Sequence, residues 1–303
     1  MFSTLKHLVF DPPPLAVFEL TEQRITAIRR DHRTLEVAAR AEVPIEPGVI
    51  DPSAVRPNVL EAEQLGDAIG EALDQLGPIR RPEAALILPD TCSRLTVLEF
   101  DNLPPKTDER ESLIRFRLAK AVPFDAESAR LAYKLQKSAG GFLALVSITP
   151  AEVVAQYEGV FEQAGLWPGH ITSSAAAALN LASNGSTALF VKLAGRSMTM
   201  AAIDEQVVKL VRTVDINAGP DSESGEMLGD MVADLYPTLV YLEDNLGAPV
   251  RKLELCGFGE LLRPAIDYLG NELHYEIEAV TGPAGLTGSN DAGIWGYLEG
   301  AAA

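Results

Sequence analysis

One hairpin pattern occurs twice in this chain, and that repeat constrains the fold more than any other feature. Residues 15–30 (LAVFELTEQRITAIRR) and residues 187–204 (TALFVKLAGRSMTMAAID) each read as an apolar strand, a short polar turn and a second strand ending in charge. After the first hairpin come a third strand, an amphipathic helix at 61–76 and a buried strand at 84–88, which is the order of a mixed α/β layer fold. A hairpin used twice in one chain predicts two similar halves.

The polar run ASNGS at residues 182–186 marks the predicted boundary between the halves. We expect a first domain over residues 1–185 and a second, shorter domain over residues 186–303, because 303 residues suffice for two domains that share a cleft. Within the first domain, residues 101–141 read as a small strand-helix-strand insertion. A helix at 149–164 is predicted to begin with a capping box of Thr149 and Glu152.

Acidic residues outnumber basic residues by 43 to 25, which gives a formal net charge of −18. A surface of that sign repels the phosphates of nucleic acids and of anionic lipids, so we expect neither nucleic-acid binding nor direct lipid binding. A basic protein segment is a better partner, although an acidic excess also serves solubility alone.

The sequence carries no pattern of a metal site or of a familiar enzyme. Cys92 and Cys256 lie far apart, and the four histidines have no ligand spacing, so no metal site is expected. Phosphate-loop, dinucleotide, zinc-protease and serine-hydrolase motifs are all missing from the sequence, and no catalytic residue is assigned. Residues 1–10 lack the apolar core of a secretory signal, and no apolar run approaches the roughly 20 residues of a membrane span, which predicts a cytoplasmic protein.

Five short motifs occur in an order and spacing that is more specific than any one of them. They are Leu88-Pro89, the strand RLTVLEF at residues 94–100, Val122-Pro123-Phe124, Ile148-Thr149-Pro150 and Ala164-Gly165-Leu166. In this order they resemble the PilM family of type IV pilus assembly proteins, whose actin-like fold is related to that of the cell-division protein FtsA. The resemblance covers most of the chain and weakens after residue 218. It implies an α/β, actin-like fold of duplicated ribonuclease H-like domains, with a small inserted subdomain and a shortened second half.

The first nucleotide motif of that family is altered here. Family members carry a phosphate hairpin of the form Asp-Ile-Gly-Ser-Ser, and this chain aligns Glu19, Leu20, Thr21, Glu22 and Gln23 with it. Glu19 keeps a carboxylate that is able to organise Mg²⁺. Thr21, however, replaces the glycine that lets backbone N–H groups approach phosphate, and Glu22 adds a charge that repels phosphate.

The second motif departs further from the family. Where the family has Asp-Ile-Gly, this chain has Lys192, Leu193 and Ala194, followed by Gly195 and Arg196. The second metal-organising carboxylate has therefore become a cation. Two readings stay open: Lys192 and Arg196 together are able to hold a phosphate without metal, and Lys192 is also able to pair with Glu19 across the cleft.

The third motif is an adenosine loop, Gly-Gly-Gly in the family, which Gly257 and Gly259 match in part. Phe258 fills its centre, and a turn from strand to helix would favour the two glycines in any case. The resemblance thus implies a degenerate nucleotide cleft. We expect no ATP hydrolysis and no resident cofactor, with binding of ATP and Mg²⁺ disfavoured.

The resemblance also implies a partner. In the PilM family, a groove between the first domain and the inserted subdomain accepts the cytoplasmic N-terminal peptide of a PilN-like, single-span inner-membrane protein. Such tails tend to be basic, which suits an acidic receptor. By similarity we expect the groove to be lined by a set from the 94–100 strand and the following helix, namely Arg94, Thr96, Leu98, Leu113, Phe116 and Lys120.

The function that the resemblance implies is a cytoplasmic scaffold of a pilus inner-membrane platform, held at the membrane through its protein partners. Pilus motor or platform proteins are further candidate partners. Two alternatives remain: an actin-like ATP-binding protein or ATPase, which would need intact phosphate turns, and a relative of the cytoplasmic domains of type II secretion systems. The groove residues named above could equally belong to a core.

Overall fold

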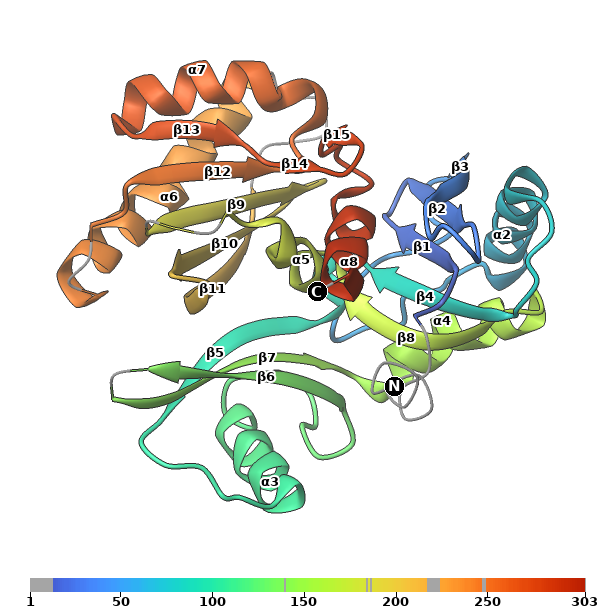
Figure 1. The fold of residues 1–303 in the computed structure, drawn as a ribbon, viewed down its shortest axis with the longest axis horizontal. Coiled ribbons are helices and arrows are strands. Elements are labelled where there is room, and N and C mark those ends of the chain that lie inside the picture. Colours follow the sequence, from blue (N-terminus) through green and yellow to red (C-terminus); the bar gives the residue numbers. More distant parts are fainter. Residues whose placement is uncertain are drawn as a thin grey trace.

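The computed structural model describes residues 13–138, 140–183, 185, 187–216, 224–246 and 249–302. The segment at residues 1–10 and two residues of the boundary run, 184 and 186, lie outside these ranges. Two five-stranded sheets and one three-stranded sheet form three units around a central helix, α8 (Ala292–Ala302) (Figure 1).

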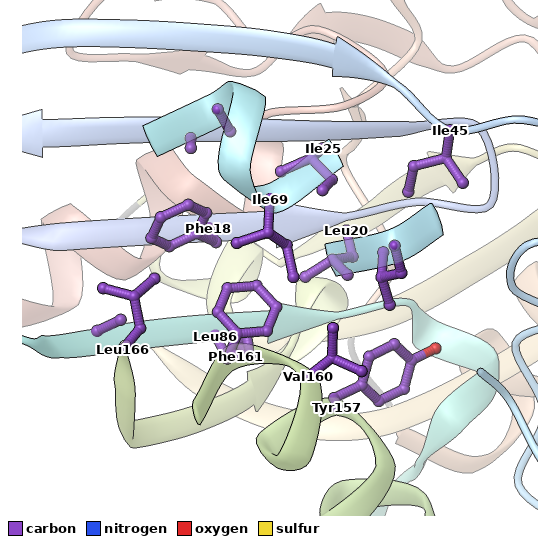
Figure 2. Close-up of a cluster of buried hydrophobic side chains, with 14 of the residues drawn as sticks. Phe18, Leu20, Ile25, Ile45, Ile69, Leu86, Tyr157, Val160, Phe161 and Leu166 are labelled. Carbon is purple, nitrogen blue, oxygen red and sulfur yellow. The ribbon is translucent and has the colours of Figure 1, made fainter. Parts of the chain in front are cut away.

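The first half is a mixed sheet of strand order β3-β2-β1-β4-β8. Its strands are β1 (Ala16–Leu20), β2 (Arg24–Arg30), β3 (Val37–Pro44), β4 (Glu83–Leu88) and β8 (Trp167–Ser173). β1 pairs with β2 in antiparallel and with β4 in parallel orientation. Helices α2 (Ala62–Leu76) and α4 (Ala151–Gln163) cover one face, and Figure 2 shows the apolar core beneath them, where the rings of Phe18 and Phe161 meet edge to face.

The second half repeats this arrangement with the strand order β11-β10-β9-β12-β13. Its strands are β9 (Ala188–Ala194), β10 (Ser197–Asp204), β11 (Val207–Asp215), β12 (Lys252–Cys256) and β13 (Glu276–Ala279). Again the first three strands are antiparallel and the last two join in parallel. Helices α6 (Ser224–Leu246) and α7 (Leu262–Leu273) cover one face. The two sheets confirm the α/β fold of duplicated halves that the repeated hairpin predicted.

The inserted subdomain is larger than the predicted range of 101–141. It is an antiparallel sheet of order β5-β7-β6, formed by β5 (Arg94–Phe100), β6 (Arg130–Ser138) and β7 (Gly141–Thr149), with α3 (Thr107–Leu118) on one face. Strand β5 and most of β7 lie outside the predicted range but pair along their whole length, so they belong to the same unit.

The last helix, α8, packs on the first half although the sequence placed it in the second domain. Ile294, Trp295 and Leu298 lie against Val17 and Ile87 on the face of the first sheet opposite α2 and α4. Helix α5 (Ser174–Ala178) and the short helix η2 (Leu179–Leu181) lie beside it. The second sheet turns its remaining face toward α5 and β5, so the three units share buried contacts.

Two local expectations differ from the structure. Strand β8 was not anticipated, because its residues (WPGHITS) are mostly partly or fully exposed and lack an apolar period. Helix α4 begins at Ala151 with Pro150 as its N-cap and without a side-chain cap, so Thr149 and Glu152 form no capping box. Within the described ranges, none of the helices combines the length and the apolar character that crossing a bilayer requires.

Candidate functional site

The two repeated hairpins meet at one cavity, as two facing phosphate turns would. The β1–β2 turn at Thr21 and the β9–β10 turn at Gly195 and Arg196 both line it, together with Asp90 and Ser174 from the first half. Its volume is about 170 Å³, below the roughly 300–1,000 Å³ of ordinary small-molecule pockets. This interdomain cleft is therefore present but small.

Glu19, near the end of β1, is turned inward and serves the protein's own structure. Its carboxylate accepts hydrogen bonds from the backbone N–H of Gly293 at 3.2 Å and of Ile294 at 2.9 Å, and from the hydroxyl of Ser174. A carboxylate at these N–H groups caps the positive end of α8. The residue is 2% exposed. Its oxygens are thus already occupied by donors that hold α8 on the first half.

Lys192, in the middle of β9, crosses from the second half into the first. Its Nζ lies 2.7 Å from Oδ2 of Asp90, and each side chain is 2% exposed. Asp90 belongs to the short helix η1 (Asp90–Cys92) after β4, and its other oxygen accepts a hydrogen bond from the backbone N–H of Ala175 at the start of α5. The ion pair therefore joins the two halves at the floor of the cleft.

The charges around Lys192 explain why it stays protonated in a buried place. Burial acts to lower the pKa of Lys192, but the attraction of Asp90 and Glu19 outweighs it and holds that pKa above its ordinary value. Burial raises the pKa of Glu19, while Lys192 and the hydrogen bonds from Ser174 and α8 oppose the rise. The pairing of Lys192 is thus with Asp90, and Glu19 is a neighbouring charge instead of the direct partner that the sequence suggested.

Thr21 and Arg196, one polar residue from each turn, are also engaged within the protein. The Thr21 hydroxyl donates to the backbone carbonyl of Arg24 and closes the first turn. Arg196 donates from Nε and Nη2 to the carbonyl of Ile216, both at 3.3 Å. Gly195 has a φ of +57°, which makes it the left-handed residue of the second turn. Lys192 and Arg196 therefore do not converge on a common phosphate site.

In the segment that aligns with the adenosine loop, Gly257 and Phe258 both serve the packing of the second half. A side chain at Gly257 would place Cβ 2.6 Å from the carbonyl oxygen of Leu193, so the close approach of β12 to β9 requires glycine there. Phe258 is buried in the core of the second half. Gly259 lines a second, open cavity of about 430 Å³, which shares Asn290 with the first. Its wall includes an ion pair of 2.9 Å between Arg40 and Asp291.

The residues present do not fit a bound Mg²⁺-nucleotide. Glu19 is held by Ser174 and the N-terminus of α8, and Asp90 by Lys192 and the N-terminus of α5. The cavity of about 170 Å³ between the turns is smaller than ordinary ligand pockets. In the described part of the chain, no group of three or more His, Cys, Asp or Glu side chains is arranged to hold a metal ion. A buried ammonium stands where the family has a metal-organising carboxylate.

The residues predicted to line the partner groove lie on the α3 side of the inserted sheet. Leu98 and Leu113 pack against the small core between α3 and the sheet, whereas Phe116 points outward and is 68% exposed. Arg94 and Lys120 are exposed, and Thr96 is partly buried. None of these six residues lines the two cavities described next.

A groove does separate the first domain from the inserted subdomain, on the other face of the sheet. It consists of a cavity of about 230 Å³ among β6, β7, β8 and α4, and a second of about 470 Å³ that continues toward α5, η2 and the β10–β11 hairpin. Ala132, Ser147 and Thr172 line both cavities, so the two are continuous. We call this the subdomain groove. Strands β6 and β8 are the outer strands of their sheets and face it.

Sequence reasoning missed two residues of the cleft and most of the groove. Asp90 follows a Leu-Pro turn, and Ser174 precedes an alanine-rich stretch. Nothing local distinguishes either residue from an ordinary turn or cap residue. The lining of the groove comes from several elements, and on β6 it includes Ala132, Lys134 and Gln136, which no hydropathy pattern marks as one face.

Two duplicated sheets around a cleft, with a subdomain inserted into the first half, form an actin-like fold. The sequence matches no family model and no curated protein. The structure is similar to a chain of a solved PilM-PilN type IV pilus biogenesis complex, with a TM-score of 0.79 and 17% identity over 96% of this chain and 99% of that one. It is less similar to a Bacteroides thetaiotaomicron protein of actin-like ATPase fold and unknown function, with a TM-score of 0.59, 8% identity and coverage of 93% and 94%. These likenesses confirm the actin-like fold and the PilM-like architecture expected from the sequence motifs.

Proposed function

We propose that this protein is a non-hydrolysing scaffold of a type IV pilus-like assembly platform, which holds the cytoplasmic N-terminal tail of a PilN-like, single-span inner-membrane protein. It would work in the cytoplasm and reach the membrane through that partner. The observation that carries the proposal is the Lys192–Asp90 pair, because it supplies internally the positive charge that an actin-like ATPase takes from a metal.

The subdomain groove is the place proposed for the tail. An extended peptide adds readily to a free strand edge, and the groove lies along β6 and β8, two outer strands of neighbouring sheets. Its wall carries both apolar and polar side chains, such as Leu95, Leu145 and Ser147. The net charge of −18 favours a basic partner. Cytoplasmic tails of membrane proteins tend to be basic according to the positive-inside rule.

The proposal is tested with synthetic peptides that copy the cytoplasmic N-termini of single-span membrane proteins encoded beside this one. We expect one of them to bind without nucleotide. Ala132→Arg, at an exposed position shared by both cavities of the groove, is expected to weaken that binding about tenfold or more, since it adds bulk and a repelling charge.

Phe116→Ala is the matched variant on the α3 side, where the sequence placed the groove. The proposal expects it to leave the Kd within about twofold. If Phe116→Ala abolishes binding and Ala132→Arg does not, the tail binds on the α3 side and the scaffold function stands with a different site. If no tail peptide binds while Mg²⁺-ATP does, the scaffold function itself is wrong.

A further inference from the structure

Helix α6, on the second half, exposes apolar side chains that its own fold does not use. Tyr236, Val240 and Tyr241 are 63%, 40% and 50% exposed. The buried side of the helix is a separate stripe that packs on the second sheet, formed by Leu228, Met231, Leu235, Leu239 and Leu242. Large apolar residues gathered within two turns on the outer side of a helix are typical of an interaction surface.

Five acidic residues lie along the same helix, which contains no Lys or Arg. The acidic residues are Glu226, Asp230, Asp234, Glu243 and Asp244. Arg212 of β11 reaches the helix and contacts Asp234 at 3.4 Å and Thr238 at 3.2 Å. In the described part of the chain, no ion pair involves Glu226, Asp230 or Asp244.

The negative charge of α6 discriminates between the possible binding partners of its apolar face. A second copy of this chain would bring the same acidic residues against this face of α6. An anionic membrane surface would be repelled by them in the same way. A basic amphipathic segment of another protein suits both the apolar and the acidic residues of α6. Its apolar side chains cover the tyrosines, and its Lys or Arg residues face the carboxylates.

We propose that the outer face of α6 is a docking surface for a basic amphipathic segment of a second protein. This surface lies on the face of the second sheet opposite the one that packs against α5 and the inserted subdomain. It is thus separate from the subdomain groove, and both sites can be filled at once. The protein then connects two components, one through each half.

The probe for this surface is a helical Leu-Lys amphipathic peptide of about 18 residues, or five turns, titrated into the full chain at physiological salt. Tyr236→Ala combined with Tyr241→Ala is expected to weaken its Kd about tenfold or more, since two anchors are lost. The control pairs Val55→Ala with Leu286→Ala, at positions that are 60% and 62% exposed elsewhere, and is expected to stay within about twofold.

Two outcomes overturn the proposal. If the tyrosine variant binds the peptide as the wild type does, the peptide adheres by charge alone and α6 is not its site. If the wild type instead dimerises in sedimentation equilibrium, or pellets with phosphatidylglycerol vesicles, and the tyrosine variant does neither, then the occupant is a second copy or a membrane. Each variant must also show the same thermal unfolding midpoint as the wild type, so that a change in binding does not come from unfolding.

Discussion

At the scale of single residues, one ammonium group joins the two halves in the cleft. Lys192 lies in a strand that aligns with one ending in Asp-Ile-Gly in the PilM family, so the charge at the floor of the cleft has the opposite sign here. A buried pair gains little over an apolar one, but removing one partner leaves a charge without solvent or counter-ion. Lys192 is therefore required by its neighbours more than by any ligand.

Lys192→Met is expected to lower the free energy of unfolding by about 3–5 kcal/mol, because Asp90 and Glu19 lose their buried cation. Asp90→Asn in the same chain should restore part of the loss. Arg24→Ala, which removes an ion pair with Glu42 whose side chains are about 40% exposed, should cost only about 0–1 kcal/mol. Urea unfolding gives all three values, and equal costs for Lys192→Met and Arg24→Ala would contradict the assignment.

The same residue predicts a pH dependence. The pKa of Lys192 in the folded chain lies above its ordinary value of 10.5, so its stabilising effect is complete below pH 10.5 and is lost as the pH rises through the folded pKa. The difference in unfolding free energy between wild type and Lys192→Met should therefore be constant from neutral pH to about 10 and shrink above it. A difference that stays constant as the pH is raised well above 10.5 would contradict this assignment.

At the scale of elements, the sequence predicted what is local and periodic. The hairpins, α2 and β5 follow from strand alternation and helical amphipathicity, and the structure confirms them. Edge strand β8 has no such period, and the cap of α8 comes from Glu19, 274 residues away. The partner of Lys192 is 102 residues away. Contacts of this kind leave no pattern in the sequence, which is why Lys192 was identified as unusual while Asp90 was not among its predicted partners.

Helix α8 offers a test of this packing. A side chain at Gly296 would place Cβ 2.2 Å from the carbonyl oxygen of Ala177 in α5, a backbone atom that cannot move aside. We expect Gly296→Ala to destabilise the protein by about 1–3 kcal/mol.

Gly159→Ala in α4 is the matched control, because no atom lies within 4 Å of its added Cβ. It should be neutral or stabilising by up to about 1 kcal/mol, since alanine favours the helix more than glycine does. If the two variants unfold at the same denaturant concentration, α8 does not pack on α5 as described.

At the scale of the whole molecule, the two halves are joined at several points without a nucleotide. The Lys192–Asp90 pair, the Arg40–Asp291 pair and α8 itself all connect them. In an actin-like ATPase the ligand occupies this position, and its loss lets the halves move. Here internal contacts join the halves, which suits the proposed scaffold, since it would present its grooves in one arrangement. The sequence indicated that the cleft was altered. The position of the subdomain groove could not be predicted in this way, because it follows from how the three sheets pack together.

The most direct test of this account is one calorimetric comparison, in which the same preparation is titrated with the N-terminal tail peptides of neighbouring single-span membrane proteins and, separately, with Mg²⁺-ATP. We expect a tail peptide to bind with a Kd that Mg²⁺-ATP does not change, and Mg²⁺-ATP itself to give no binding heat up to about millimolar concentration. Binding of Mg²⁺-ATP with turnover, and no binding of any tail peptide, would contradict it.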